Sequence, residues 1–151
     1  MAWVTEALVE GELSYNLTDS TQPTSAETAE FITSIEAVVK GVLHSLKIDP
    51  DAILLASTPD AYYVVQQWAL FGVCSRVLAA AGGLIRAQTD KEKEYWSRFH
   101  SYWHDLKEDP SILGNDAPFY TGDLATLWPD GIVVADSDDY HDPIFTMDKE
   151  F

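Results

Sequence analysis

The stretch that decides the fold runs from Thr58 to Ala81 and reads TPDAYYVVQQWALFGVCSRVLAAA. Its first three residues form a helix start, because Thr58 can cap, Pro59 pre-sets φ and Asp60 complements the helix dipole. Apolar residues then cover more than one face of a predicted helix over about residues 59–81. Such a helix lies at the centre of its domain or is partly covered by a neighbouring subunit. Small residues along it allow other backbones to come close: Ala69, Gly72, Ala79, Ala80 and Ala81.

A second helix is predicted upstream, over about residues 25–47. Thr24 and Glu27 have the spacing of a capping box, in which the two residues satisfy free backbone N–H groups reciprocally. Gly41 lies inside this helix and indicates close approach by a neighbour, because Gly weakens a helix by roughly 1 kcal/mol relative to Ala. Eight apolar residues share one stripe at helical spacing: Phe31, Ile32, Ile35, Val38, Val39, Val42, Leu43 and Leu46. After Pro50, residues 52–56 predict a short helix.

A third long helix is predicted from Thr89 to about Asp109. Thr89 and Glu92 repeat the capping-box spacing, and Pro110 ends the helix. Its predicted buried stripe contains Tyr95, Phe99, Tyr102 or Trp103, and Leu106.

Both ends of the chain lack a long helical pattern. Residues 1–23 predict an irregular arm with a short strand or helix near residues 3–8. After Pro110 the chain is rich in Gly and Pro, and residues 132–135 predict a short strand. The expected fold is therefore mainly α: a bundle of three to four helices over residues 24–110, between an extended N-terminal arm (1–23) and an extended, partly β C-terminal segment (111–151).

The charge of this chain is concentrated at its ends. The 151 residues include nine Lys or Arg and 25 Asp or Glu, for a net charge of −16. Residues 1–39 carry −7, residues 40–109 carry −1 and residues 110–151 carry −8. This distribution argues against autonomous binding to DNA, RNA or anionic lipid. No stretch approaches the roughly 18 apolar residues of a membrane span, so no membrane partner is expected.

No residue pattern indicates catalysis, a cofactor or a metal. His100 and His104 have the i, i+4 spacing of a metal pair, but Ser101 stands where a zincin has Glu, and packing or surface roles are favoured. The acidic run 136–142 lacks the Gly and Glu of an EF-hand loop. Cys74 lies within the apolar helix and is interpreted as a small hydrophobic residue. We therefore expect no enzyme activity.

The acidic last segment nevertheless contains many aromatic residues, which a purely solvating tail does not need. We interpret it as an extended segment that docks on its own helices or on another chain. The residues predicted to bind a partner are Trp128, Ile144, Phe145 and Phe151.

Four features together resemble the head-to-tail adaptor proteins of tailed bacteriophages. They are residues 58–62 opening a long small-residue helix, the aromatic last helix, residues 109–114 after it, and the terminal residues 142–151. On the last helix the likeness rests on Tyr95, Trp96, Phe99 and Leu106. The likeness covers about residues 25–114 and the terminal decapeptide. It lies in the order of the helices and in their residue composition.

This resemblance implies a virion protein of the neck, assembled in the host cytoplasm. The family forms rings, here expected to be twelvefold, below the portal protein of the capsid. Its other partner is the stopper or tail-completion protein, and DNA passes through the channel without being specifically bound. The resemblance implies no catalytic residue. It also implies that terminal segments grip the portal or a neighbour, and we expect a strand added to a partner's sheet, anchored by Ile144, Phe145 and Phe151.

Other functions remain open at this point. An acidic DNA mimic, or a regulatory protein that inhibits a DNA-binding partner, would carry regularly spaced carboxylates on one exposed face. The acids here lie mainly in the two ends, which disfavours that reading. A small helical enzyme or cofactor binder lacks the necessary ligand set or nucleophile–base pair. A halophilic origin would explain an Asp-rich, Lys-poor composition regardless of function.

Overall fold

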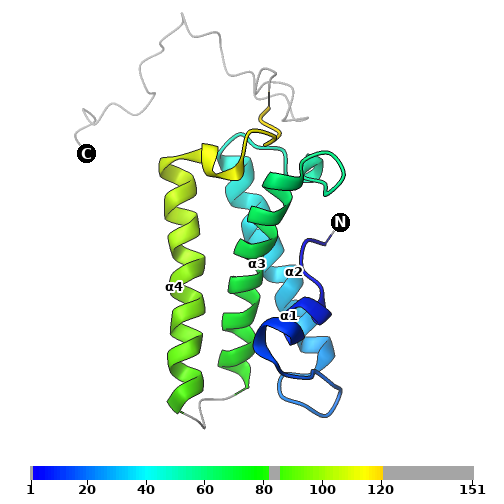
Figure 1. Ribbon diagram of the computed structural model, residues 1–151. Coiled ribbons are helices and arrows are strands. Elements are labelled where there is room, and N and C mark those ends of the chain that lie inside the picture. The colour runs from blue at the N-terminus through cyan, green and yellow to red at the C-terminus, as the bar shows by residue number, and fades with distance from the viewer. Residues whose placement is uncertain (1, 82–85, 121–151) are drawn as a thin grey trace, which may run out of the picture. The chain divides into compact units, whose positions relative to one another are not determined.

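The computed structural model describes residues 2–81 and 86–120 and, within these ranges, forms a helical bundle (Figure 1). Its α-helices are α1 (Glu6–Leu13), α2 (Ser25–Ser45), α3 (Pro59–Ala80) and α4 (Arg86–Glu108). Two short 3-10 helices, η1 (Pro50–Ala52) and η2 (Pro110–Leu113), follow α2 and α4. The described residues contain no named strand, so the predicted mainly α fold is confirmed. The predicted strand at 132–135 lies outside the described residues.

The central helix of the bundle is α3, as its apolar sequence predicts. It packs against α4 on one side and against α1 and α2 on the other (Figure 1). Trp68 of α3 is fully buried, stacks on Phe99 of α4 with ring centroids 5.6 Å apart, and donates its indole N–H to the Phe99 carbonyl oxygen at 3.0 Å. This aromatic contact joins the two longest helices.

Gly72 allows the three long helices to meet. A Cβ atom at this position would lie 2.8 Å from Cδ2 of Phe99 and 2.9 Å from Cγ2 of Ile35. The close approach predicted from small residues on this helix is therefore confirmed at Gly72. The similar prediction for Gly41 is wrong, because a Cβ at Gly41 would meet no described atom within 4 Å.

The capping box of α2 is present as predicted. The Thr24 hydroxyl oxygen accepts from the Glu27 backbone N–H at 3.2 Å, and the Glu27 carboxylate accepts from the Thr24 backbone N–H at 2.8 Å. The hydrogen bond from the Thr24 backbone lowers the pKa of Glu27. Local sequence alone therefore determines where α2 begins.

The start of α3 is capped by a distant residue instead of by Thr58. The Thr58 hydroxyl oxygen accepts from the Leu54 backbone N–H at 2.8 Å, so it faces the preceding turn. Asp116 takes its place, because its two carboxylate oxygens accept from the backbone N–H groups of Asp60 at 2.9 Å and Ala61 at 3.0 Å. The prediction that the Thr58 side chain caps this helix is therefore wrong. The backbone N–H groups at the start of α3 are satisfied by a carboxylate that lies 55 residues from Ala61 in the sequence.

Two other predicted boundaries are wrong. The helix α4 begins at Arg86 rather than at Thr89, because the intervening residues of α4 include good helix formers that extend it. The short helix expected over residues 52–56 is only the 3-10 turn η1, and Ile53 already has an extended backbone. The predicted end of the last helix before Pro110 is confirmed, since α4 ends at Glu108.

The N-terminal segment is part of the bundle. Of the two predicted alternatives, a short strand or a short helix, the helix forms. Trp3, Val4 and Val9 are buried in the core. The Glu36 carboxylate on α2 accepts from the backbone N–H groups of Trp3 at 2.6 Å and Val4 at 2.9 Å. Gln66 of α3 donates to the Trp3 carbonyl oxygen at 2.7 Å. These bonds hold the segment against α2 and α3, so it is not an extended arm.

The compact unit ends at Tyr120 rather than at Pro110. Leu113 is fully buried, and Ile48 pairs with Phe119 in an isolated antiparallel bridge. The Tyr120 backbone N–H also donates to the Lys47 carbonyl oxygen at 2.8 Å. Residues 110–120 are therefore packed on the helices and belong to the same compact unit.

Candidate interaction surface

The residues predicted to bind partners, Trp128, Ile144, Phe145 and Phe151, lie outside the described residues, as does the acidic run 136–142. Within the described part, two features bear on function: a surface stripe on α4 and a small cavity beside α1.

The helix α4 carries two parallel stripes of side chains. The first is the predicted one and faces α3: Phe99 and Leu106 are buried, while Tyr95 and Tyr102 are partly buried. The second lies beside it at steps of three, four, three and four residues, which align side chains along a helix. We name it the α4 surface stripe, and it consists of Lys93, Trp96, His100, Trp103 and Lys107.

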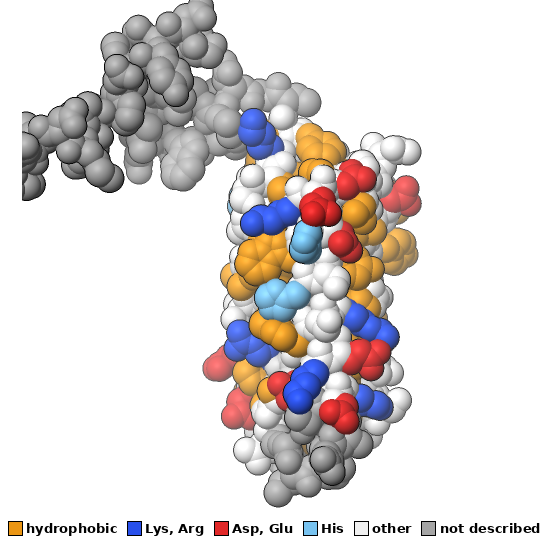
Figure 2. All heavy atoms as spheres, turned by 90° about the vertical axis from the view of Figure 1, so that its left-hand side faces the viewer, with side chains coloured by type: hydrophobic (Ala, Val, Ile, Leu, Met, Phe, Trp, Pro, Cys, Tyr) orange, Lys and Arg blue, Asp and Glu red, His pale blue; other side chains and the backbone are white. Residues whose placement is uncertain are grey.

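From Trp96 to Lys107, the side chains of the α4 surface stripe contact one another in sequence. The rings of Trp96 and His100 meet edge to face with centroids 4.5 Å apart, and His100 stacks on Trp103 at 5.9 Å. The Lys107 ammonium lies 5.7 Å from the centroid of a Trp103 ring, within the range of a cation–π contact. Trp96 leaves 40% of its surface exposed. In Figure 2, hydrophobic and histidine side chains run together over this side of the molecule.

The α4 surface stripe contains no acidic residue, in a chain of net charge −16. Five of the nine Lys and Arg residues of the chain belong to α4. Two acids of α4 have basic neighbours outside the stripe, because Glu94 pairs with Arg98 and Glu108 lies 3.5 Å from His104. The stripe therefore combines positive charge with exposed aromatic surface.

Trp103 has a further unusual property. Its indole N–H is buried and has no hydrogen-bond partner among the described residues. A buried donor without an acceptor costs about 1–3 kcal/mol. The surface stripe thus contains a polar atom whose acceptor the described residues do not supply.

The two histidines do not form a metal site with other described side chains. His100 lies between the two tryptophans of the stripe, whereas His104 lies beside Glu108. No group of three His, Cys, Asp or Glu side chains is suitably placed within residues 2–81 and 90–120. A surface or packing role for the pair was expected from the sequence, but the surface stripe was not, although its three-and-four spacing is visible beside the buried stripe.

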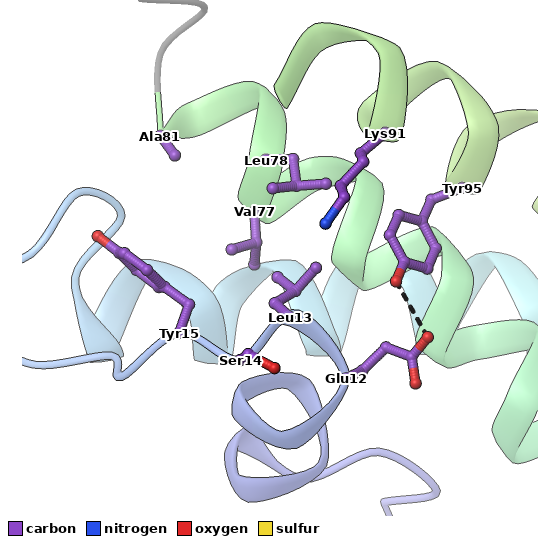
Figure 3. A pocket seen from close by; sticks show the side chains of 9 residues that line it. All are labelled: Glu12, Leu13, Ser14, Tyr15, Val77, Leu78, Ala81, Lys91 and Tyr95. Atoms are coloured by element: carbon purple, nitrogen blue, oxygen red, sulfur yellow. Dashed lines mark hydrogen bonds between the residues drawn. The ribbon is translucent and has the colours of Figure 1, made fainter. Parts of the chain in front are cut away.

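A cavity of about 130 Å³ lies between α1, α3 and α4 (Figure 3). Along the wall of the cavity, the Tyr95 hydroxyl donates to the Glu12 carboxylate at 3.0 Å. The Lys91 side chain extends toward the cavity. Burial and this hydrogen bond raise the pKa of Tyr95 to about 12. The lining residues are Glu12, Leu13, Ser14, Tyr15, Val77, Leu78, Ala81, Lys91 and Tyr95. The cavity is large enough for a few water molecules, well below the size of a typical ligand pocket.

Cys74 is a core residue, which confirms the interpretation from sequence. It is fully buried in α3. Burial, and to a smaller extent the nearby charge of Glu12, raises the pKa of its thiol to about 12. Because the thiolate is the reactive form, this thiol is inert at neutral pH.

None of the helices in the described residues is both long and apolar enough to cross a membrane. Comparison with protein-family models, with curated proteins and with solved structures finds no match for this chain.

Proposed function

We propose that this chain is a structural assembly protein that acts as a head-to-tail adaptor of a tailed bacteriophage. In this role, identical copies form a ring, expected to be twelvefold, between the portal protein and the stopper or tail-completion protein of the virion neck. The observation that carries the proposal is the α4 surface stripe. The resemblance in helix order and residue composition to head-to-tail adaptors is what points to the ring of the virion neck in particular.

The α4 surface stripe has the composition of a protein interface. Tryptophan is enriched among the residues that dominate binding energy, and aromatic residues are enriched at the centres of interfaces. Trp96 and Trp103 stand on a helix that packs along α3, beside its buried stripe, and Trp96 is exposed while Trp103 is partly buried. A continuous row of aromatic and basic side chains on such an edge helix favours contact with another protein.

The charge distribution fits passage of DNA without capture. Affinity for DNA depends largely on Lys and Arg contacts to phosphate. The chain has only nine such residues, and Lys40 and Arg98 already pair with acids. A ring of this chain would therefore surround a DNA channel without holding the duplex specifically.

The alternative function, an acidic DNA mimic or regulatory inhibitor of a DNA-binding protein, has less support. A mimic needs an exposed row of carboxylates that reproduces phosphate spacing. The longest described helix, α4, carries five acidic and five basic residues, and the α4 surface stripe is free of acids. This surface is unsuited to a site that binds DNA phosphates.

Antibody labelling of phage particles in electron microscopy tests the proposed location. Antibodies against the full chain should label the junction between capsid and tail on particles made by the host that carries the gene. The proposal would be contradicted if purified particles lacked the chain. Inhibition of a DNA-binding enzyme by the pure protein would then support the alternative.

A further inference from the structure

The α4 surface stripe and the last part of the chain have complementary chemistry. The stripe presents two lysines, a histidine and two tryptophans, with no acid among them. Residues 121–151, here called the C-terminal segment, contain eight Asp or Glu against Lys149 alone, together with four aromatic residues. We propose that the stripe of one copy binds the C-terminal segment of a neighbouring copy. This inference rests on the proposed function, because it supplies the contact between copies that a ring requires.

The spacing of charges on the two partners matches. Lys93 and Lys107 lie fourteen residues apart on α4, which corresponds to about 21 Å along a helix. Asp142 and Asp148 lie six residues apart, and an extended chain of that length spans about 20 Å. An extended strand over residues 142–148 can therefore place one carboxylate near each lysine.

The residues between these charges match as well. In an extended strand alternate side chains share a face, so Ile144 lies on the same face as Asp142 and Asp148 and between them, as the aromatic side chains of the stripe lie between its two lysines. Ile144 on the rings of Trp96 and Trp103 would remove apolar surface from water.

The length of the C-terminal segment permits contact with another copy. Its 31 residues can extend over about 100 Å, whereas α4 is about 35 Å long. A contact between two different surfaces, a helix stripe and a terminal segment, is heterologous and can close into a ring. The contact thus has the symmetry that the proposed assembly needs.

Zero-length carbodiimide cross-linking of the full chain tests this contact, because the reagent joins a lysine amine directly to a nearby carboxylate. An equal mixture of unlabelled and ¹⁵N-labelled protein separates links between copies from links within one copy. We expect Lys93 and Lys107 to be linked to acids of residues 142–150 in mixed-isotope pairs. Links found only within one isotope, or no link from either lysine to the segment, would overturn the inference.

Matched variants show whether the apolar contact carries the binding. Trp96→Ser and Ile144→Ser should each lower the yield of mixed-isotope links at least tenfold, while circular dichroism shows that the helices remain. Tyr63→Ser removes a 58% exposed aromatic residue from α3 and should leave the yield unchanged. Equal loss in all three variants, or no loss in the first two, would contradict docking on the stripe.

The outcomes separate this contact from the proposed function. If the chain labels the phage neck and assembles, but its lysines are not linked to the C-terminal segment, the contact is wrong and the adaptor proposal stands. If mixed-isotope links form but particles lack the chain, the contact stands and the adaptor proposal is wrong.

Discussion

Asp116 shows how a single residue from a distant segment completes a helix. Its carboxylate accepts the two backbone N–H groups at the start of α3, at 2.9 Å from Asp60 and 3.0 Å from Ala61. It also ties residues 110–120 to the bundle. The sequence around Thr58 predicted the helix start correctly but not its cap, because the competing hydrogen bond to Leu54 is visible only in three dimensions.

Replacing Asp116 should therefore destabilise the bundle. Asp116→Ala leaves both N–H groups without their acceptor, and we expect the free energy of unfolding to fall by about 1 kcal/mol. Urea denaturation measures the change. Asp19→Ala, at an exposed position, is the matched control and should stay within about 0.5 kcal/mol of the parent protein. Equal stability of both variants would show that Asp116 is not a functional cap.

Two glycines in neighbouring helices should respond oppositely to the same change. Gly72→Ala puts a Cβ against Phe99 and Ile35 and should cost about 1–3 kcal/mol of unfolding free energy. Gly41→Ala meets open space and should stabilise α2 by up to about 1 kcal/mol. Thermal unfolding of the two variants checks both signs. Stabilisation by Gly72→Ala would contradict the close packing of the three long helices.

Cys74 should make stability depend on pH in the alkaline range. Burial raises the pKa of its thiol from 9.0 to about 12, so the folded state retains a proton that the unfolded chain loses. The stabilising contribution is complete below pH 9 and is lost as the pH rises from 9 toward 12. Urea denaturation at pH 8 and pH 10.5 should show a smaller loss for Cys74→Ala than for the parent protein. An identical pH dependence of the two proteins would contradict this assignment.

At the scale of elements, helices with strong local signals were predictable from sequence. The capping box at Thr24 and the apolar stripe behind it define α2, and the apolar run after Pro59 defines α3. The helix α1 was harder, because eight residues are too few to show a clear helical period and only Val9 of them is buried. The residues just before it are held by tertiary hydrogen bonds from the backbone of Trp3 and Val4 to the Glu36 carboxylate. Such contacts between distant residues have no local sequence signal.

The buried position of Trp3 distinguishes a core segment from a free arm. Trp3→Ala should lower the free energy of unfolding by about 3–5 kcal/mol, because a fully buried indole is removed from the core. Leu8→Ala, in α1 but 38% exposed, should cost much less. Urea denaturation of both variants gives the comparison. If Trp3→Ala cost no more than Leu8→Ala, the segment would behave as the free arm expected from sequence.

The candidate surface was only partly predictable for a related reason. The sequence pattern placed Trp96, Trp103 and the two histidines on one helix and predicted the buried stripe through Phe99 and Leu106. Which of two adjacent stripes faces α3 depends on how α4 is rotated, and that rotation is set by the stacking of Phe99 on Trp68. Only the packed structure shows that the neighbouring stripe is left on the surface.

At the scale of the whole molecule, the charge and the fold divide the chain in a similar way. Residues 40–109 are nearly neutral and supply most of the helical body, whereas the acids concentrate toward the two ends. The N-terminal acids nevertheless belong to a packed segment, because Glu6 and Glu36 lie within α1 and α2. The acidic residues of the N-terminal part therefore belong to the folded bundle.

The central claim is that copies of this chain assemble, and sedimentation of the full chain across concentration tests it most directly. We predict a species much heavier than the 16.8 kDa chain as the concentration rises, with a ring visible in electron microscopy. Deletion of residues 141–151 should abolish this species while circular dichroism reports nearly unchanged helical content. A single species of 16.8 kDa from micromolar to millimolar concentration would contradict the account.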